Sequence, residues 1–77
     1  MWQYLNINMA GLYWVVFRHD NRIFEVDVFQ RGKGLWYDLR YKEWDHKLDS
    51  RSLEELDILF GGVKAFCLRT EDEPPAL

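Results

Sequence analysis

The sequence predicts a small α+β domain in which an antiparallel sheet carries one short helix on one face. Three observations favour this class. Three stretches rich in aromatic and β-branched residues follow one another between turn-forming residues, a helix signature comes after them, and a last apolar stretch follows the helix. The expected order is β-β-β-β-α-β, with residues 1–70 as a single domain and 71–77 as a mobile acidic tail.

The first group of strands is a meander of three. Aromatic and β-branched residues dominate 12–19, 23–30 and 35–42. The link between the last two, Arg31-Gly32-Lys33-Gly34, places a lysine between glycines as a phosphate-binding loop might. Such a loop has four residues between its glycines and a helix after it, whereas here one residue separates them and a strand follows. The link is therefore interpreted as a two-residue turn with Gly32 in the first position of type II′.

This turn fixes the pairing of the strands on either side of it. It brings apolar residues opposite each other in three pairs: Val28 with Tyr37, Val26 with Leu39, and Phe24 with Tyr41. A shift by one residue would place charged side chains on the same face. A similar turn at Asp20-Asn21 would set three further apolar residues beside them: Phe17, Val15 and Tyr13. Both turns therefore favour one continuously apolar face.

The chain on either side of the meander is less regular. Residues 2–9 are expected to form a further strand, joined by Ala10-Gly11, and the sequence leaves its register open. Residues 43–51 are polar and irregular apart from Trp44 and Leu48. We therefore expect a loop between the meander and the helix.

The helix has a start, an apolar stripe and a stop. Ser52-Leu53-Glu54-Glu55 is a capping box, in which Ser52 and Glu55 each bond the other's backbone. Apolar residues follow at three- and four-residue intervals: Leu53, Leu56, Leu59 and Phe60. Gly61-Gly62 can supply a left-handed C-terminal cap. We expect the helix to lie across the apolar face of the sheet, with residues 63–70 as the last strand.

Composition restricts the function further. The one cysteine, Cys67, excludes an internal disulfide, and no run of eighteen apolar residues or signal peptide is present, which favours a cytoplasmic protein outside the membrane. Three of the thirteen acids behind the net charge of −3 belong to Glu71-Asp72-Glu73, so the remaining body is nearly neutral. Direct nucleic-acid binding is therefore not expected. No cofactor or metal site is predicted.

The second face of the sheet is unusually apolar for a face that a single helix leaves uncovered. In the predicted register it carries five large apolar residues, Trp14, Val16, Ile23, Phe29 and Trp36, and six charged ones, Arg18, Glu25, Asp27, Asp38, Arg40 and Lys42. Two interpretations remain open. The N-terminal strand, residues 43–51 or the tail covers the aromatics as a second small core, or the face binds a partner or a second copy of the chain.

Three cross-strand pairs on this face follow from the same register. Phe29 faces Trp36, Glu25 faces Arg40, and Asp27 faces Asp38. Directly opposed aspartates repel by a few tenths of a kcal/mol up to about 1 kcal/mol. Three cations, Arg18, Arg40 and Lys42, are candidates to neutralise them. The alternative is that the aspartates meet a basic group of a partner or a metal ion.

The sequence evidence for a catalytic site is weaker than the evidence for a binding surface on this face. His19 falls in a turn and His46 in a polar loop, positions where histidines are usually solvated. Cys67 lies between apolar neighbours and is expected to be a buried, inert thiol. Asp27 and Asp38 could act as paired carboxylates only beside a substrate cleft. The chain is therefore not expected to be an enzyme.

The sequence favours a non-enzymatic protein–protein interaction module, an inhibitor or adaptor that occupies a partner's surface. Trp14, Phe29 and Trp36 would anchor the contact, and Asp27, Asp38 and Arg40 would meet charged groups, including a basic, nucleic-acid-binding surface of the partner. Size and composition are similar to those of small inhibitors from phages and other mobile elements. Two alternatives remain: a sugar or single-stranded nucleic-acid binder that uses exposed tryptophans, and a small nuclease that uses His46.

Overall fold

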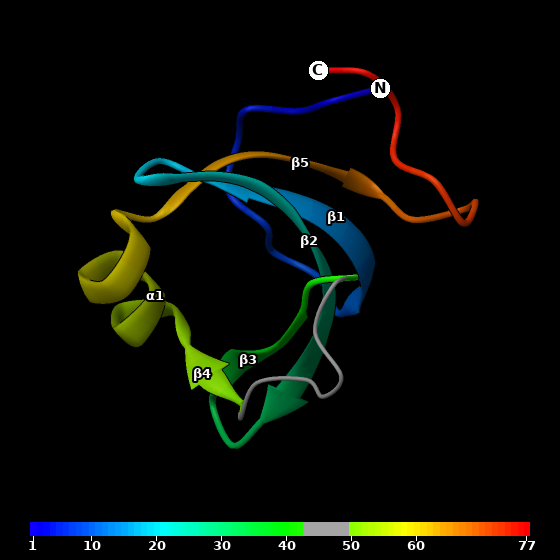
Figure 1. The fold of residues 1–77 in the computed structure, drawn as a ribbon. Helices are drawn as coiled ribbons and strands as arrows, with labels where there is room; N and C mark the ends of the chain where they lie inside the picture. The colour runs from blue at the N-terminus through cyan, green and yellow to red at the C-terminus, as the bar shows by residue number, and fades with distance from the viewer. Residues whose placement is uncertain (43–49) are drawn as a thin grey trace.

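A five-stranded antiparallel sheet and one helix form the part of the chain that the structure describes (Figure 1). The structure is a computed structural model that describes residues 1–42 and 50–77. Its elements are β1 (Gly11–Phe17), β2 (Asp20–Arg31), β3 (Gly34–Arg40), β4 (Arg51–Ser52), α1 (Leu53–Phe60) and β5 (Val63–Leu68). The strands lie side by side in the order β4-β3-β2-β1-β5. The predicted α+β class is confirmed, and so is the order of element types, although one of the four strands before the helix is not the segment expected.

The sheet curls, and α1 lies at its open side between the two edge strands (Figure 1). The helix joins β4 to β5 and contacts β3, β4 and β5. The main core fills the space between the concave face and the helix. Its fully buried members are Val15, Phe17, Phe24, Val26, Val28, Tyr37, Leu39 and Leu56. Each large apolar side chain buried in this way stabilises the fold by about 1.5–3 kcal/mol.

The β2–β3 hairpin has the predicted register. Val26 pairs with Leu39 and Val28 with Tyr37, and Arg31 pairs with Gly34 across a two-residue turn. Gly32 has a φ of 61°, while no non-glycine residue among those described has a positive φ. A positive φ at the first turn position and not at the second is the pattern of type II′. The Gly-Lys-Gly stretch is a turn.

The predicted β1–β2 turn is wrong by two residues. Phe17 pairs with Asp20, so the turn residues are Arg18 and His19, and a bulge follows between Val16 and Phe17. Beyond the bulge Val15 pairs with Phe24 rather than with Val26. Within the paired strands, a shift of two residues keeps the side chains on their predicted faces, because strand side chains alternate with a period of two.

Contacts from outside the turn explain this shift. The Asp20 carboxylate accepts hydrogen bonds from the backbone N–H of Arg22 at 3.1 Å and from its guanidinium at 2.6 Å, so Asp20 is engaged within β2. The backbone N–H groups of Arg18 and His19 donate to the carbonyls of Gly62 and Phe60, each at 2.9 Å. The end of the helix therefore holds the turn in place.

The expected strand at residues 2–9 is also wrong. One bridge joins Gln3 to Phe66, with N–H···O distances of 2.7 and 2.9 Å. Ile7 is buried in the core, whereas Tyr4 and Leu5 are 71% and 77% exposed, so the segment does not alternate as a sheet strand would. The fourth strand along the chain is instead β4. Its first residue, Arg51, belongs to the segment expected to be irregular, whose residues 43–49 lie outside the described residues.

The ends of the helix are as predicted, and its apolar stripe is only partly so. Ser52 and Glu55 form the reciprocal capping box, and Gly61 takes the left-handed conformation with a φ of 74°. Leu56 is fully buried and Phe60 half-buried, but Leu53 and Leu59 are 44% and 54% exposed. The eight-residue helix packs against the edges of the curled sheet, so one narrow side is covered. In the described residues, no helix combines the length and apolar character needed to cross a membrane.

Replacing Gly61 should destabilise the fold far more than replacing Gly34. A Cβ at Gly61 would lie 2.5–2.8 Å from ring atoms of His19 and would occupy a left-handed backbone, whereas a Cβ at Gly34 meets nothing within 4 Å. Urea unfolding should show Gly61→Ala costing about 1–3 kcal/mol and Gly34→Ala less than about 0.5 kcal/mol. Equal losses for the two variants would contradict the packing of His19 on the helix end.

The Asp20–Arg22 pair should make stability depend on acid pH. The hydrogen bond from Arg22 lowers the pKa of Asp20 in the fold, so its contribution is complete above the unfolded pKa of about 3.9 and is lost as pH falls through the lower folded value. Asp20→Asn should therefore be less stable than the wild type at pH 7, and the difference should vanish near pH 2. Asp72→Asn, in the exposed tail, is the control; a difference for Asp20→Asn that persists at low pH would contradict the assignment.

Candidate functional site

The second face of the sheet is divided into a covered half over β1 and β5 and a more open half over β2 and β3. Trp14 and Val16 on β1 are 5% and 2% exposed, and their partners Cys67 and Ala65 on β5 are 3% and 1% exposed. On β2 and β3, Phe29 and Trp36 are only half-buried. The interpretation of a covered second core therefore describes the β1–β5 half, whereas a binding role for the β2–β3 half stays a prediction.

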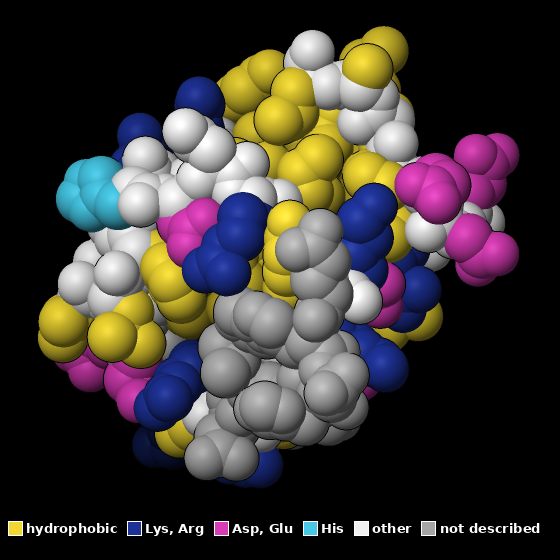
Figure 2. Space-filling view, in the orientation of Figure 1, with side chains coloured by type: hydrophobic (Ala, Val, Ile, Leu, Met, Phe, Trp, Pro, Cys, Tyr) yellow, Lys and Arg dark blue, Asp and Glu magenta, His cyan; other side chains and the backbone are white. Residues whose placement is uncertain are grey.

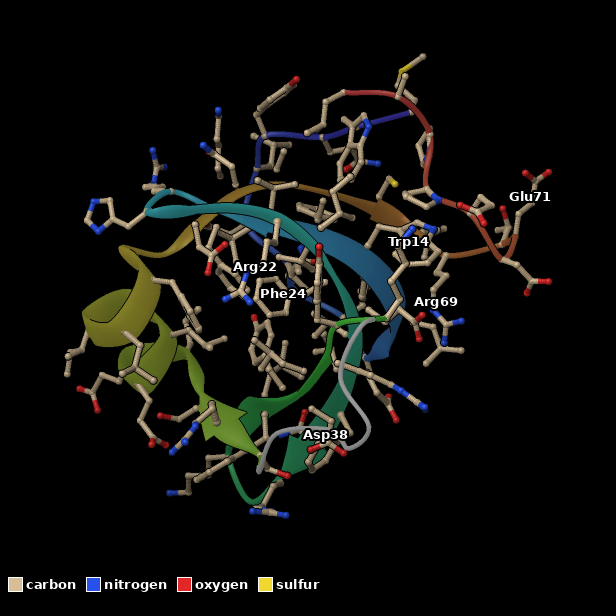
Figure 3. All side chains as sticks on the ribbon, in the orientation of Figure 1. Trp14, Arg22, Phe24, Asp38, Arg69 and Glu71 are labelled. Carbon is tan, nitrogen blue, oxygen red and sulfur yellow. The ribbon has the colours of Figure 1, made fainter. Side chains whose placement is uncertain are left out.

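Both chain termini cover the Trp14 half. Trp2 donates its indole N–H to the carbonyl of Ala76 at 3.0 Å, which ties the first residues to the last. Pro74 of the tail lines two hollows beside Trp14, the larger of about 480 Å³. Figure 3 shows Trp14 between β1 and the C-terminal segment, with Arg69 alongside, whose guanidinium carbon lies 5.6 Å from the Trp14 ring centroid. Trp14 is thus part of a second core.

The open half contains an organised aromatic group. Phe29 on β2 pairs with Trp36 on β3, as predicted. The guanidinium carbon of Arg31 lies 5.3 Å from the Phe29 ring centroid and 4.7 Å from that of Trp36, within the range of cation–π attraction. The Arg31 guanidinium is therefore close enough to attract both rings. We call Phe29, Arg31, Lys33 and Trp36 the hairpin patch.

The aspartate pair lies one step further from the turn than the aromatics. Asp27 pairs with Asp38, and Glu25 with Arg40, in the predicted register. Asp27 is exposed, whereas Asp38 is half-buried and accepts a hydrogen bond from the hydroxyl of Ser50. The two aspartates share a shallow groove of about 170 Å³ with Arg40 and Arg69.

This groove changes the set of cations assigned to the aspartates. Arg40 lines it as predicted, and Arg69 joins it from beyond β5. Arg18 does not belong there, because it lies in the β1–β2 turn against the end of the helix. Two arginines thus reduce the repulsion between the carboxylates. Among the described residues, no cluster of three or more His, Cys, Asp or Glu side chains could hold a metal ion.

The six residues predicted for the site are therefore not one group. Five share the open half of the face: Phe29, Trp36, Asp27, Asp38 and Arg40. Trp14 lies in the covered half and is only 5% exposed, so the structure separates it from the other five. The sequence analysis missed the role of Arg31 and Arg69. Arg31 could have been found, because it is two residues from Phe29 on the same strand and so projects from the same face.

The alternative chemistries gain little from the structure. Burial raises the pKa of the Cys67 thiol, which disfavours the nucleophilic thiolate. The His19 ring packs where a Gly61 side chain would lie. Arg31 stacks on Trp36, which leaves less of the indole for a sugar or a base. Trp44 and His46 lie outside the described residues.

Comparisons with known proteins do not place the chain in a family. It matches no protein-family model, and no curated protein or solved structure is significantly similar to it.

Trp14 and Trp36 should differ in their contribution to stability. Trp14→Ala would leave a cavity in the second core and should cost about 3–5 kcal/mol, a large part of the roughly 4–12 kcal/mol expected for a domain of this size. Trp36→Ala removes a half-buried ring and should cost about 1–2 kcal/mol. Urea unfolding, monitored by far-UV circular dichroism, measures the free energy of unfolding of both variants. A cost for Trp36→Ala as large as that for Trp14→Ala would show that the chain itself covers the open half.

Proposed function

We propose that this protein is a non-enzymatic protein-binding module, an inhibitor or adaptor that acts by occupying a surface of a partner protein. The contact surface is the open half of the second face, formed by β2 and β3. Trp36 and Phe29 anchor it, and Asp27, Asp38 and Arg40 form its charged rim.

The observation that carries this proposal is the Phe29–Trp36 pair with Arg31 stacked over both rings. Tryptophan and arginine are the residues that most often dominate binding energy at protein interfaces. Rings held in place before binding lose less conformational freedom when a partner arrives, so more of the contact energy appears as affinity. The pair also lies on strands, which position side chains more rigidly than loops do.

The surroundings of the pair support the same role. This face is the outer side of the curled sheet, and such a surface suits another protein better than a small substrate. The charged residues beside it lie in register across two strands, so they can match a partner in one orientation only. Binding would block whatever else uses the covered surface of the partner, which is how so small a domain inhibits without chemistry.

The test is the affinity for a partner captured from the native host and then purified. Trp36→Ala combined with Asp38→Lys should weaken binding at least about 30-fold, the effect of removing a residue that dominates an interface. The matched control is Ile58→Ala with Leu59→Ala, which removes exposed apolar side chains from the helix instead. Circular dichroism confirms that each variant is folded.

Two results would contradict the proposal. One is unchanged affinity of the Trp36→Ala, Asp38→Lys variant. The other is an equal loss for the helix control, which would place the contact on α1 or make it unspecific.

A further inference from the structure

The open half of the face is arranged in layers along the β2–β3 hairpin. Going towards the turn, Glu25 pairs with Arg40, then Asp27 with Asp38, then Phe29 with Trp36, and finally Arg31 with Gly34. Acidic groups thus stop one layer before the aromatics. Beyond the aromatics, the charged side chains are Arg31 and, in the turn itself, Lys33.

The turn end of the hairpin carries two cations that form no ion pair with any residue the structure describes. Residues 28–37 include two cations and no acid. Among the described residues, neither Arg31 nor Lys33 forms an ion pair, and both are exposed. The turn lies at the lower end of the molecule in Figure 1, where Lys and Arg side chains gather in the space-filling view (Figure 2). The cations are therefore open to a partner.

The stacking of Arg31 decides what kind of partner group it can take. A guanidinium attracted to aromatic rings through its flat side keeps its N–H groups in its own plane, where they can still donate. Two parallel N–H groups match the two oxygens of a carboxylate, which gives stronger and more directional bonds than a single contact. The Phe29 and Trp36 rings restrict the side chain, so less rotamer freedom is lost on binding.

We propose that the hairpin patch binds an acidic segment of a partner protein. An Asp or Glu of that segment pairs with Arg31, Lys33 adds attraction, and a neighbouring apolar side chain lies against Trp36. This inference rests on the proposed function and adds the chemical class of the partner at one end of the surface.

The aspartate layer argues against a nucleic acid at the same place. A strand with a phosphate at every nucleotide would have to continue along the hairpin past Asp27 and Asp38, whose charges repel it. A protein segment can present a carboxylate at the turn and a neutral or basic residue further along. Two cations are also few for a polyanion, which needs a track of positive charge.

The test uses a random dodecapeptide library displayed on phage and selected on the immobilised protein. Peptides selected by the wild type should be enriched in Asp or Glu next to an apolar residue. Arg31→Glu with Lys33→Glu should instead select peptides rich in Lys and Arg. The control Lys64→Glu, which changes an exposed lysine on β5, should select the same acidic peptides as the wild type.

One selected acidic peptide is then synthesised with a fluorescent label and titrated by anisotropy. Arg31→Glu with Lys33→Glu should weaken its binding at least about tenfold, as expected when a charged pair turns repulsive. Lys64→Glu should change the affinity less than twofold. Binding by the wild type should weaken with added salt, because exposed charges are screened.

The outcomes separate this inference from the proposed function. Peptides that depend on Trp36 but show no acidic enrichment overturn the inference and leave the proposed function standing. Peptides whose binding survives Trp36→Ala overturn both. If a labelled oligothymidylate binds the wild type and this binding is lost with Arg31→Glu and Lys33→Glu, the inference is overturned in favour of a nucleic acid. If the wild type enriches no peptide, the inference is also overturned, because the patch then has no peptide partner.

Discussion

One short helix cannot cover a five-stranded sheet, and this constraint explains the rest of the structure. Eight residues of α1 reach only the open side of the curl, where Leu56 enters the main core. The second face needs other cover, and the two ends of the chain supply it over Trp14. They do not extend as far over Phe29 and Trp36. Phe29 and Trp36 are only half-buried, on the face of the sheet opposite to α1.

The sheet separates two cores that depend on different kinds of contact. The main core is formed by side chains of strands that are far apart in the sequence, with Leu56 of the helix and Ile7 of the N-terminal segment. The second core is smaller and lies where the two termini meet, through the hydrogen bond between Trp2 and Ala76. The hairpin patch belongs to neither core. Substitutions at surface positions outside both cores usually change the stability of the fold little.

Local sequence signals correctly predicted the features that depend only on residues close together in the chain. The turn at Gly32-Lys33 and the capping box of Ser52 and Glu55 were correct because each is completed within four residues. The β1–β2 turn was wrong because distant carbonyls of the helix end hold it. Trp14 and Trp36 could not be distinguished from sequence, since both alternate correctly on their strands. Their difference comes from where the tail lies, and no local pattern encodes that position.

The contact between Trp2 and Ala76 brings the two ends of the chain together, at the top of the molecule in Figure 1 and away from the β2–β3 turn at the bottom. Adjacent termini make a domain suitable for insertion into a surface loop of another protein. A host protein carrying it in this way would hold the hairpin patch at the far end, directed outward. The same geometry allows a circular permutant, with a short linker joining the old ends, to present the patch unchanged.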